Sequence, residues 1–207
     1  MKHMKVLGLC LLAALAAMAV MGVGTASATK LCSVNTAPCP AESTYGKGTS
    51  IKAQLVAGTK STMSSGFTTV TCTESTMSGK TTSAGGGAGV AVTGDISSVT
   101  WKNCTSGLGA CTASALNTPW PAEVTGSGGS GTMSVTKAGG KFTCGGVTCE
   151  YEASKASVSV TGGNPARIKA SSVSFSKIGG SIFCSSTASW TSEYEATSPK
   201  PLFIVGS

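Results

Sequence analysis

Short stretches that alternate apolar and polar residues recur along most of the chain, and this two-residue period is its strongest constraint on the fold. In SIKAQLVAG, Ile51, Ala53 and Leu55 fall on one face, and in SSVTWKNC, Val99 and Trp101 do the same. Successive side chains of a strand point to opposite sides, so this alternation predicts strands with one buried face. Glycine-rich segments separate the strands, and only GLGACTASALN resembles a helical turn. We expect an all-β domain: an antiparallel β-sandwich, with a β-barrel as the alternative.

The N-terminal residues have the pattern of a secretory signal peptide. Lys2 and Lys5 precede an uncharged, largely apolar run from Val6 to Val23, and Ala-Ser-Ala then ends at Ala28. Small residues at these positions are typical of a cleavage site, so we expect cleavage between Ala28 and Thr29. The apolar run is long enough to cross a membrane, so a retained anchor is the alternative.

Residues 1–28 are therefore predicted to be a signal helix, and residues 29–207 a single secreted domain with eight cysteines. An even number of cysteines in an exported chain indicates disulfides. Residues 29–207 contain no histidine and no Cys-x-x-Cys pair, so we expect no metal or other cofactor. Closeness in the sequence favours the pairs Cys32–Cys39, Cys104–Cys111 and Cys144–Cys149, which leaves Cys72–Cys184.

Two segments of the domain resemble each other, 134–153 and 174–196. They begin SVTKAGGKFTC and SFSKIGGSIFC, and each contains EYEA further on. We expect an internal repeat in which each glycine pair forms the turn of a hairpin, with Phe142 and Ile182 at equivalent places on the returning strands. The alternative is chance similarity within a chain rich in glycine, serine and threonine.

The two EYE elements are the candidates for carboxylate chemistry. In a strand, Glu150 and Glu152 share one face, as do Glu193 and Glu195. If these strands lay side by side, four carboxylates would gather into a cation site or a hydrolase acid pair. The simpler interpretation is that the glutamates face water and the tyrosines face the core. With no histidine and only Asp95 as aspartate, Ser-His-Asp and Cys-His sites are excluded, and we expect no enzymatic activity.

Trp120 is the candidate recognition residue. It lies between two prolines in NTPWP, which predicts a rigid, extended loop and excludes a central strand. An exposed tryptophan there would stack on a sugar ring or a partner, whereas the alternative is a ring folded over the end of the domain. The net charge of +7 is spread along the chain. Such a surface suits an anionic envelope polymer or glycan, and it lacks the basic, aromatic clusters typical of nucleic-acid binding. After cleavage, we expect no stable membrane anchor.

In its alanine-rich leader and in LNTPWPAEVTG, VTGGNPARIKA and SPKPLFI, the chain resembles uncharacterised exported Gly/Ser/Thr-rich, disulfide-containing proteins of high-GC Gram-positive (actinobacterial) bacteria. The resemblance implies export and carries no activity. We therefore expect a non-enzymatic binding or structural domain, secreted or associated with the cell envelope. One alternative is a secreted hydrolase with glutamates about 5–10 Å apart in a cleft. The other is a carrier of a small ligand, which requires a barrel with an apolar cavity.

Overall fold

The computed structural model describes residues 28–66 and 68–206, so the predicted signal peptide up to residue 27 lies outside the described residues. The described part is almost entirely β structure, which confirms the prediction from the alternation. A short 3-10 helix, η1, spans Ala41–Ser43. GLGACTASALN contributes a strand instead of the helical turn that it resembles. The strands are β1 (Thr29–Cys32), β2 (Ser50–Leu55), β3 (Ser61–Ser65), β4 (Thr69–Thr81), β5 (Val92–Ser106), β6 (Gly109–Leu116), β7 (Trp120–Ser127), β8 (Ser130–Cys144), β9 (Val147–Thr161), β10 (Arg167–Gly180), β11 (Thr187–Ser198) and β12 (Phe203–Gly206).

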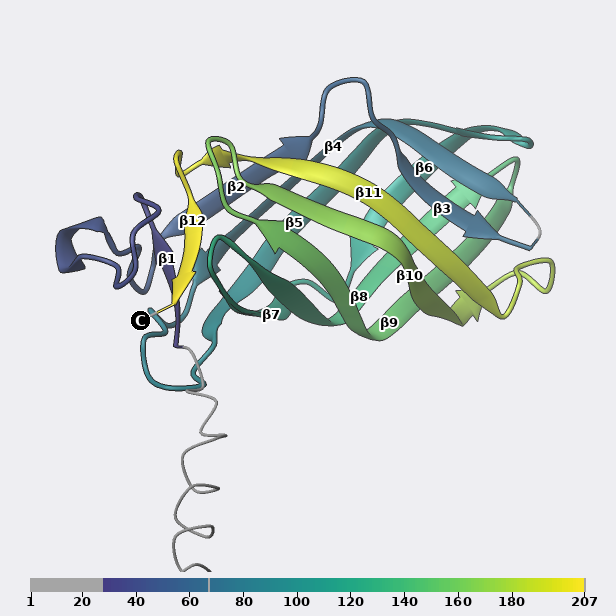
Figure 1. Ribbon diagram of the computed structural model, residues 1–207. Coiled ribbons are helices and arrows are strands. Elements are labelled where there is room, and N and C mark those ends of the chain that lie inside the picture. The colour runs from purple at the N-terminus through teal and green to yellow at the C-terminus, as the bar shows by residue number, and fades with distance from the viewer. Residues whose placement is uncertain (1–27, 67, 207) are drawn as a thin grey trace, which may run out of the picture.

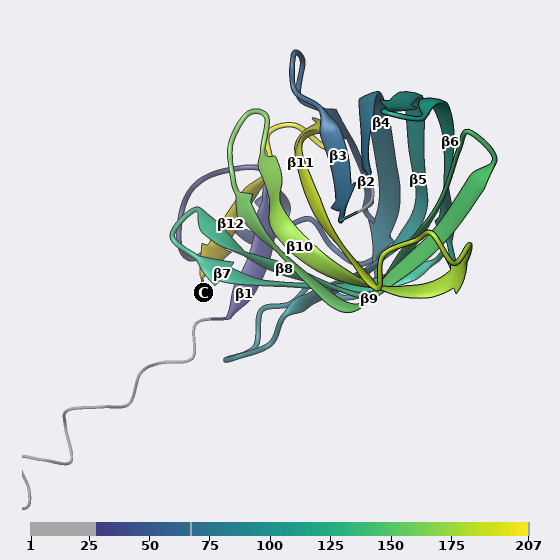
Figure 2. The same cartoon turned by 90° about the vertical axis from the view of Figure 1, so that its right-hand side faces the viewer.

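One antiparallel sheet of ten strands closes on itself as an eight-stranded barrel (Figures 1 and 2). Two positions of the ring are each filled by a pair of shorter strands. Strands β2 and β3 both pair with β11 and β4, and strands β6 and β7 both lie between β5 and β8. Closure satisfies strand edges that an open sheet would expose. Of the two architectures expected from the sequence, the barrel is therefore the one that forms.

The two ends of the barrel are built differently. At one end, β1 and β12 form a separate two-stranded sheet (Figure 1). Apolar side chains of Leu31, Leu202 and Ile204 pack there against Val92 and Val160 of the barrel. The opposite end, here called the hairpin end, carries the β5–β6, β8–β9 and β10–β11 turns. The interior between these ends is the part of the molecule available for a site.

All eight cysteines of residues 29–207 form disulfides, but three of the four expected pairings are wrong. Cys32–Cys39 forms as expected. The pairs Cys104–Cys111, Cys144–Cys149 and Cys72–Cys184 are replaced by Cys72–Cys104, Cys111–Cys144 and Cys149–Cys184, with sequence separations of 32, 33 and 35 residues.

The register of the sheet explains this correction. Cys72, Cys104, Cys111 and Cys144 lie directly opposite one another in a row across β4, β5, β6 and β8. A residue inside an antiparallel sheet lies opposite one residue on each neighbouring strand. It exchanges both backbone hydrogen bonds with one of them, and it forms a non-hydrogen-bonded pair with the other, in which the Cα atoms are closer. The Cα–Cα distances of 3.9 Å and 4.4 Å assign the close pairs to Cys72–Cys104 and Cys111–Cys144. Cys104 and Cys111 therefore form the hydrogen-bonded type of pair, in which the Cα atoms are farther apart.

The two similar segments both form strand–turn–strand units, but the predicted turns are wrong. Gly139 and Gly140 lie inside β8, and the chain turns after Cys144. In the second segment, β10 ends at Gly180 and the turn follows. Phe142 is buried whereas Ile182 is 90% exposed, so the expected equivalence of these two residues is wrong. The glycines make room for close neighbours instead: a Cβ on Gly140 would lie 2.9 Å from the ring of Phe142 in the same strand, and a Cβ on Gly180 would overlap the Thr148 carbonyl of β9.

Candidate functional site

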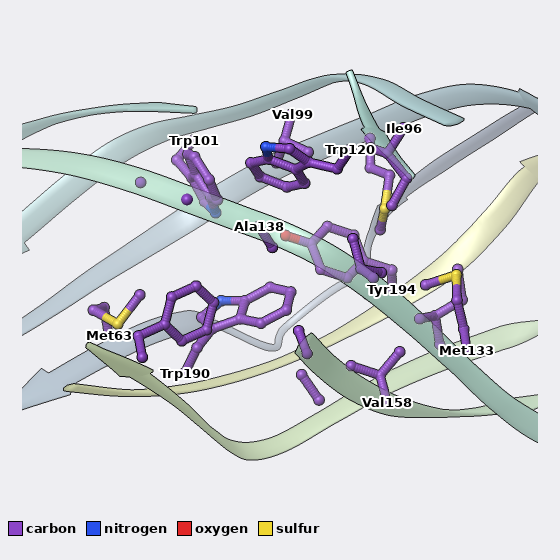
Figure 3. A pocket seen from close by; sticks show the side chains of 18 of the residues that line it. Met63, Ile96, Val99, Trp101, Trp120, Met133, Ala138, Val158, Trp190 and Tyr194 are labelled. Atoms are coloured by element: carbon purple, nitrogen blue, oxygen red, sulfur yellow. The ribbon is translucent and has the colours of Figure 1, made fainter. Parts of the chain in front are cut away.

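The centre of the barrel encloses an apolar cavity of about 50 Å³. All three tryptophans of the sequence, Trp101, Trp120 and Trp190, line it together with Tyr194 (Figure 3). None of the described residues in its wall is charged. The space exists because small residues occupy much of the wall, namely Ala138, Gly139, Gly140, Ala156 and Ala170.

A second cavity of about 80 Å³, mostly apolar but with Lys80 and Asp95 in its wall, adjoins the first on the side of β1. The two share the side chains of Met77, Ile96, Met133 and Ile168 in their walls. Methionine is flexible and adapts to irregular shapes, so Met77 and Met133 are the adjustable part of the shared wall. The interior therefore holds two adjoining, mostly apolar spaces.

The aromatic residues of the cavity are positioned by the alternation along single strands. On β11, Trp190 and Tyr194 point to the same inner face, with ring centroids 6.2 Å apart. Phe175 of the neighbouring β10 meets Trp190 edge to face at 6.4 Å. On β5, Val99 and Trp101 share the inner face, as the sequence predicted. The inward direction of these side chains was readable from the sequence, but their convergence depends on closure of the barrel.

A few polar groups lie within this apolar interior. Ser75 Oγ donates to the carbonyl of Thr100 at 2.7 Å and also lies 2.7 Å from the Tyr194 hydroxyl. Because Ser75 has one proton, which is used on Thr100, Tyr194 is the donor in the second bond. Burial raises the pKa of Tyr194, and hydrogen bonding, chiefly with Ser75, opposes this shift in part. Tyr194 therefore stays neutral in the interior at ordinary pH.

The indole N–H groups of the three tryptophans have different environments. Trp120 Nε1 donates to the Leu116 carbonyl at 2.6 Å, and Trp190 Nε1 donates to Ser61 Oγ at 3.0 Å. Trp101 Nε1 and Ser192 Oγ are buried and make no hydrogen bond of good geometry among residues 28–66 and 68–206. Both side chains lie beside the Tyr194 hydroxyl, and their hydrogen bonding helps to lower its pKa. No signal in the sequence distinguishes Trp101 from the other two, because the difference arises from strands that are distant in the chain.

The expectation that Trp120 lies in a loop is wrong. Trp120 is 6% exposed, begins β7 and pairs with Ile96. Pro121 is tolerated because β7 pairs with β8 only from Ala122 onward, so the missing N–H falls at the start of the strand. Trp120 therefore remains a candidate recognition residue only as part of the internal cavity wall.

The four glutamates of the EYE elements do not form one site. Their strands, β9 and β11, are separated by β10. Glu150 lies opposite Gly179 of β10 and Glu193 lies opposite Lys169, which places the two glutamates roughly 30 Å apart along the barrel. Glu150 pairs with Lys141 at 3.2 Å, so it acts as an ordinary surface charge. Within the described part of the chain, His, Cys, Asp and Glu residues form no group of three suited to a metal ion.

Comparison with protein-family models, with curated proteins and with solved structures found no match to the chain. None of the helices in the described residues is both long and apolar enough to cross a membrane.

Proposed function

We propose that this chain is an exported, non-enzymatic binding protein that holds a small apolar molecule inside its barrel. The observation that carries the proposal is the uncharged internal cavity, lined by all three tryptophans, at the centre of a closed barrel. Ligand sites are typically concave and apolar, with aromatic walls and few polar groups. The four disulfides favour an oxidising, extracellular setting, and the leader-like N-terminus supports export.

The energetics of packing favour a ligand over an accidental void. Protein interiors are close-packed, with few voids larger than a water molecule. An empty volume of about 50 Å³ is destabilising by about 1 kcal/mol. Larger side chains in place of Ala156 or Ala170 would reduce this void, so the small residues at these positions are explained by a molecule that occupies the space.

The carboxylate-based hydrolase receives no support from the glutamates that suggested it. A retaining or inverting acid pair requires carboxyl groups about 5–10 Å apart. Glu150 and Glu193 are several times farther apart. Glu150 and Glu152 are neighbours on one face of β9, but neither cavity described above is lined by a glutamate.

The proposal is tested by titrating the folded protein with xenon, cyclopropane and dichloromethane, which are small enough for a cavity of about 50 Å³, each followed by calorimetry and tryptophan emission. Because every tryptophan lines the cavity, a molecule bound inside should change the emission at the same concentration at which heat is released. We expect saturable binding with one site.

Ala156→Leu adds three carbon atoms at the cavity wall and should weaken binding at least about 10-fold. The matched control is Ser157→Leu on the exposed outer face of the same strand, which should leave binding unchanged. A wild-type protein that binds none of the three compounds, or equal weakening by both variants, would refute an internal site.

A further inference from the structure

The hairpin end of the barrel exposes several large apolar side chains. Ile182 and Phe183 lie in the β10–β11 loop (Figure 1) and are 90% and 61% exposed. Leu108 in the β5–β6 turn and Ile178 near the end of β10 are about half exposed. Single exposed apolar residues are ordinary, but several at one end of a molecule are typical of an interaction site. These four residues are here called the apolar tip.

The β8–β9 turn joins the parts of the apolar tip into one surface. On one side, a Cβ on Gly145 would lie 3.0 Å from the Leu108 carbonyl, so the β5–β6 turn packs directly against the β8–β9 turn. On the other side, Ser181 donates its backbone N–H to the Thr148 carbonyl at 2.8 Å. A disulfide also ties the β10–β11 loop to β9. The exposed apolar side chains are therefore held in place at the end of the barrel.

A small cavity of about 20 Å³ lies beneath these turns. Its wall includes Leu108 together with Ser65 and Thr68, which flank the β3–β4 turn, so that turn also reaches the hairpin end. None of the described residues in this wall is charged. Met63 and Phe142 line both this cavity and the central one. The uncharged region therefore extends from the apolar tip to the centre of the barrel.

The hairpin end also carries no charge at its surface. The chain segments that form its four turns contain no Lys, Arg, His, Asp or Glu, and they are 61–73, 103–116, 142–149 and 178–192. The nearest lysines of β5, β8 and β10 are Lys102, Lys141 and Lys177, and Lys141 pairs with Glu150 at 3.2 Å. Attraction between opposite charges is therefore not what this end offers to a partner.

These features favour a lipid surface over a protein partner. A specific protein interface uses roughly 20–30 residues on each side, with a polar rim that surrounds its core. The apolar tip consists of four side chains on turns that provide no charge, which is too little for a stable dimer or complex. The boundary between lipid headgroups and acyl chains accepts apolar side chains without matched shape or charge, and binding there strengthens with the apolar area buried.

We propose that the hairpin end docks on a lipid membrane by inserting Ile182 and Phe183 of the apolar tip below the headgroups. The docking is peripheral and reversible, because only a few side chains leave water. It requires no anionic lipid, since the turns that meet the membrane are uncharged. This inference goes beyond the proposed function and does not depend on what the barrel holds.

Sedimentation with phosphatidylcholine vesicles tests the proposal. The protein used begins at Thr29, because the apolar run from Val6 to Val23 would itself bind lipid. We expect binding that changes by less than about 2-fold when NaCl is raised from about 50 to about 500 mM, since salt screens charges and leaves apolar insertion in place. In sedimentation equilibrium without vesicles, the protein should remain a monomer.

Two variants locate the contact. Ile182→Ser should weaken vesicle binding at least about 10-fold, because burial of a whole isoleucine side chain contributes at least that factor. Its 90% exposure means that the fold does not depend on this side chain. Val90→Ser is the matched control: Val90 is 48% exposed at the other end of the barrel, beside β1, and the change should leave binding unaltered.

Four results would overturn the inference. Wild-type protein that does not bind phosphatidylcholine vesicles would exclude apolar insertion. Binding that needs anionic lipid and disappears at high salt would assign the attraction to the scattered lysines. Equal weakening by Ile182→Ser and Val90→Ser would place the contact elsewhere. A dimer that Ile182→Ser dissociates would assign the apolar tip to a second copy of the chain.

Discussion

Removing the Cys111–Cys144 disulfide tests both the register of the barrel and the stabilisation that its cross-links provide. The bond joins β6 to β8 across a sequence separation of 33 residues. In the chain-entropy description, a loop of this length contributes about 3.7 kcal/mol to the free energy of unfolding. The same relation gives about 2.4 kcal/mol for Cys32–Cys39, whose separation is 7 residues. We therefore expect Cys111→Ala/Cys144→Ala to lose more stability than Cys32→Ala/Cys39→Ala in urea unfolding.

Thiol titration of the same variant, unfolded but not reduced, tests the pairing directly. In protein that begins at Thr29, removing Cys111 and Cys144 together should leave no free thiol, because they are bonded to each other. If the neighbours in sequence were bonded instead, the variant would release two thiols, from Cys104 and Cys149. Two free thiols, or a loss of less than about 1 kcal/mol, would refute the register described above.

Three further predictions concern the interior. Tyr194→Phe should lower the free energy of unfolding by about 1 kcal/mol in urea titration, because it removes the hydrogen bond to Ser75; an unchanged midpoint would contradict this. Gly140→Ala should lower the free energy of unfolding by about 1–3 kcal/mol, since the new methyl group would overlap the Phe142 ring. Thr136→Ala, on the exposed face of β8, is the control. Burial raises the pKa of all three tyrosines above the usual 10. Because the unfolded chain then loses its phenolic protons first, this contribution to stability is present below pH 10 and declines above it. Absorbance of phenolate should therefore rise above pH 10 together with unfolding, and ionisation of a tyrosine at or below its usual pKa in folded protein would disprove the burial argument.

The sequence determined that the chain forms strands with one buried face. Over short stretches it also determined which side chains point inward. In β2 and β11 the alternation correctly assigned Ala53, Leu55 and Tyr194 to the buried face. It also predicted that tyrosines rather than glutamates of the EYE elements enter the core. These results follow from strand geometry alone, because a two-residue period needs no knowledge of the neighbouring strands.

The same local rule fails wherever a strand changes register. Two exposed residues in succession, Lys102 and Asn103, separate inward-facing Trp101 from inward-facing Cys104, and Asn103 has a φ of 52°. Uninterrupted alternation would place Cys104 outside with Lys102. Such an irregularity reverses the faces of all residues beyond it. This reversal brings Cys104 to the same inner face as Cys72 of β4. Sequence proximity gave the wrong disulfides because pairing depends on which strands lie beside β5 and β6 and on which strand pairs bring the Cα atoms close.

The cavity was decided by tertiary structure. Trp101, Trp120 and Trp190 come from β5, β7 and β11, and they surround one volume only because the sheet closes. Whether an indole N–H finds an acceptor depends on residues of other strands or of the preceding turn, such as Ser61 for Trp190. The sequence therefore determined which faces would be buried, since that depends on neighbours along the chain. The barrel determined what those faces enclose, because a void is the space left between strands after all of them have packed.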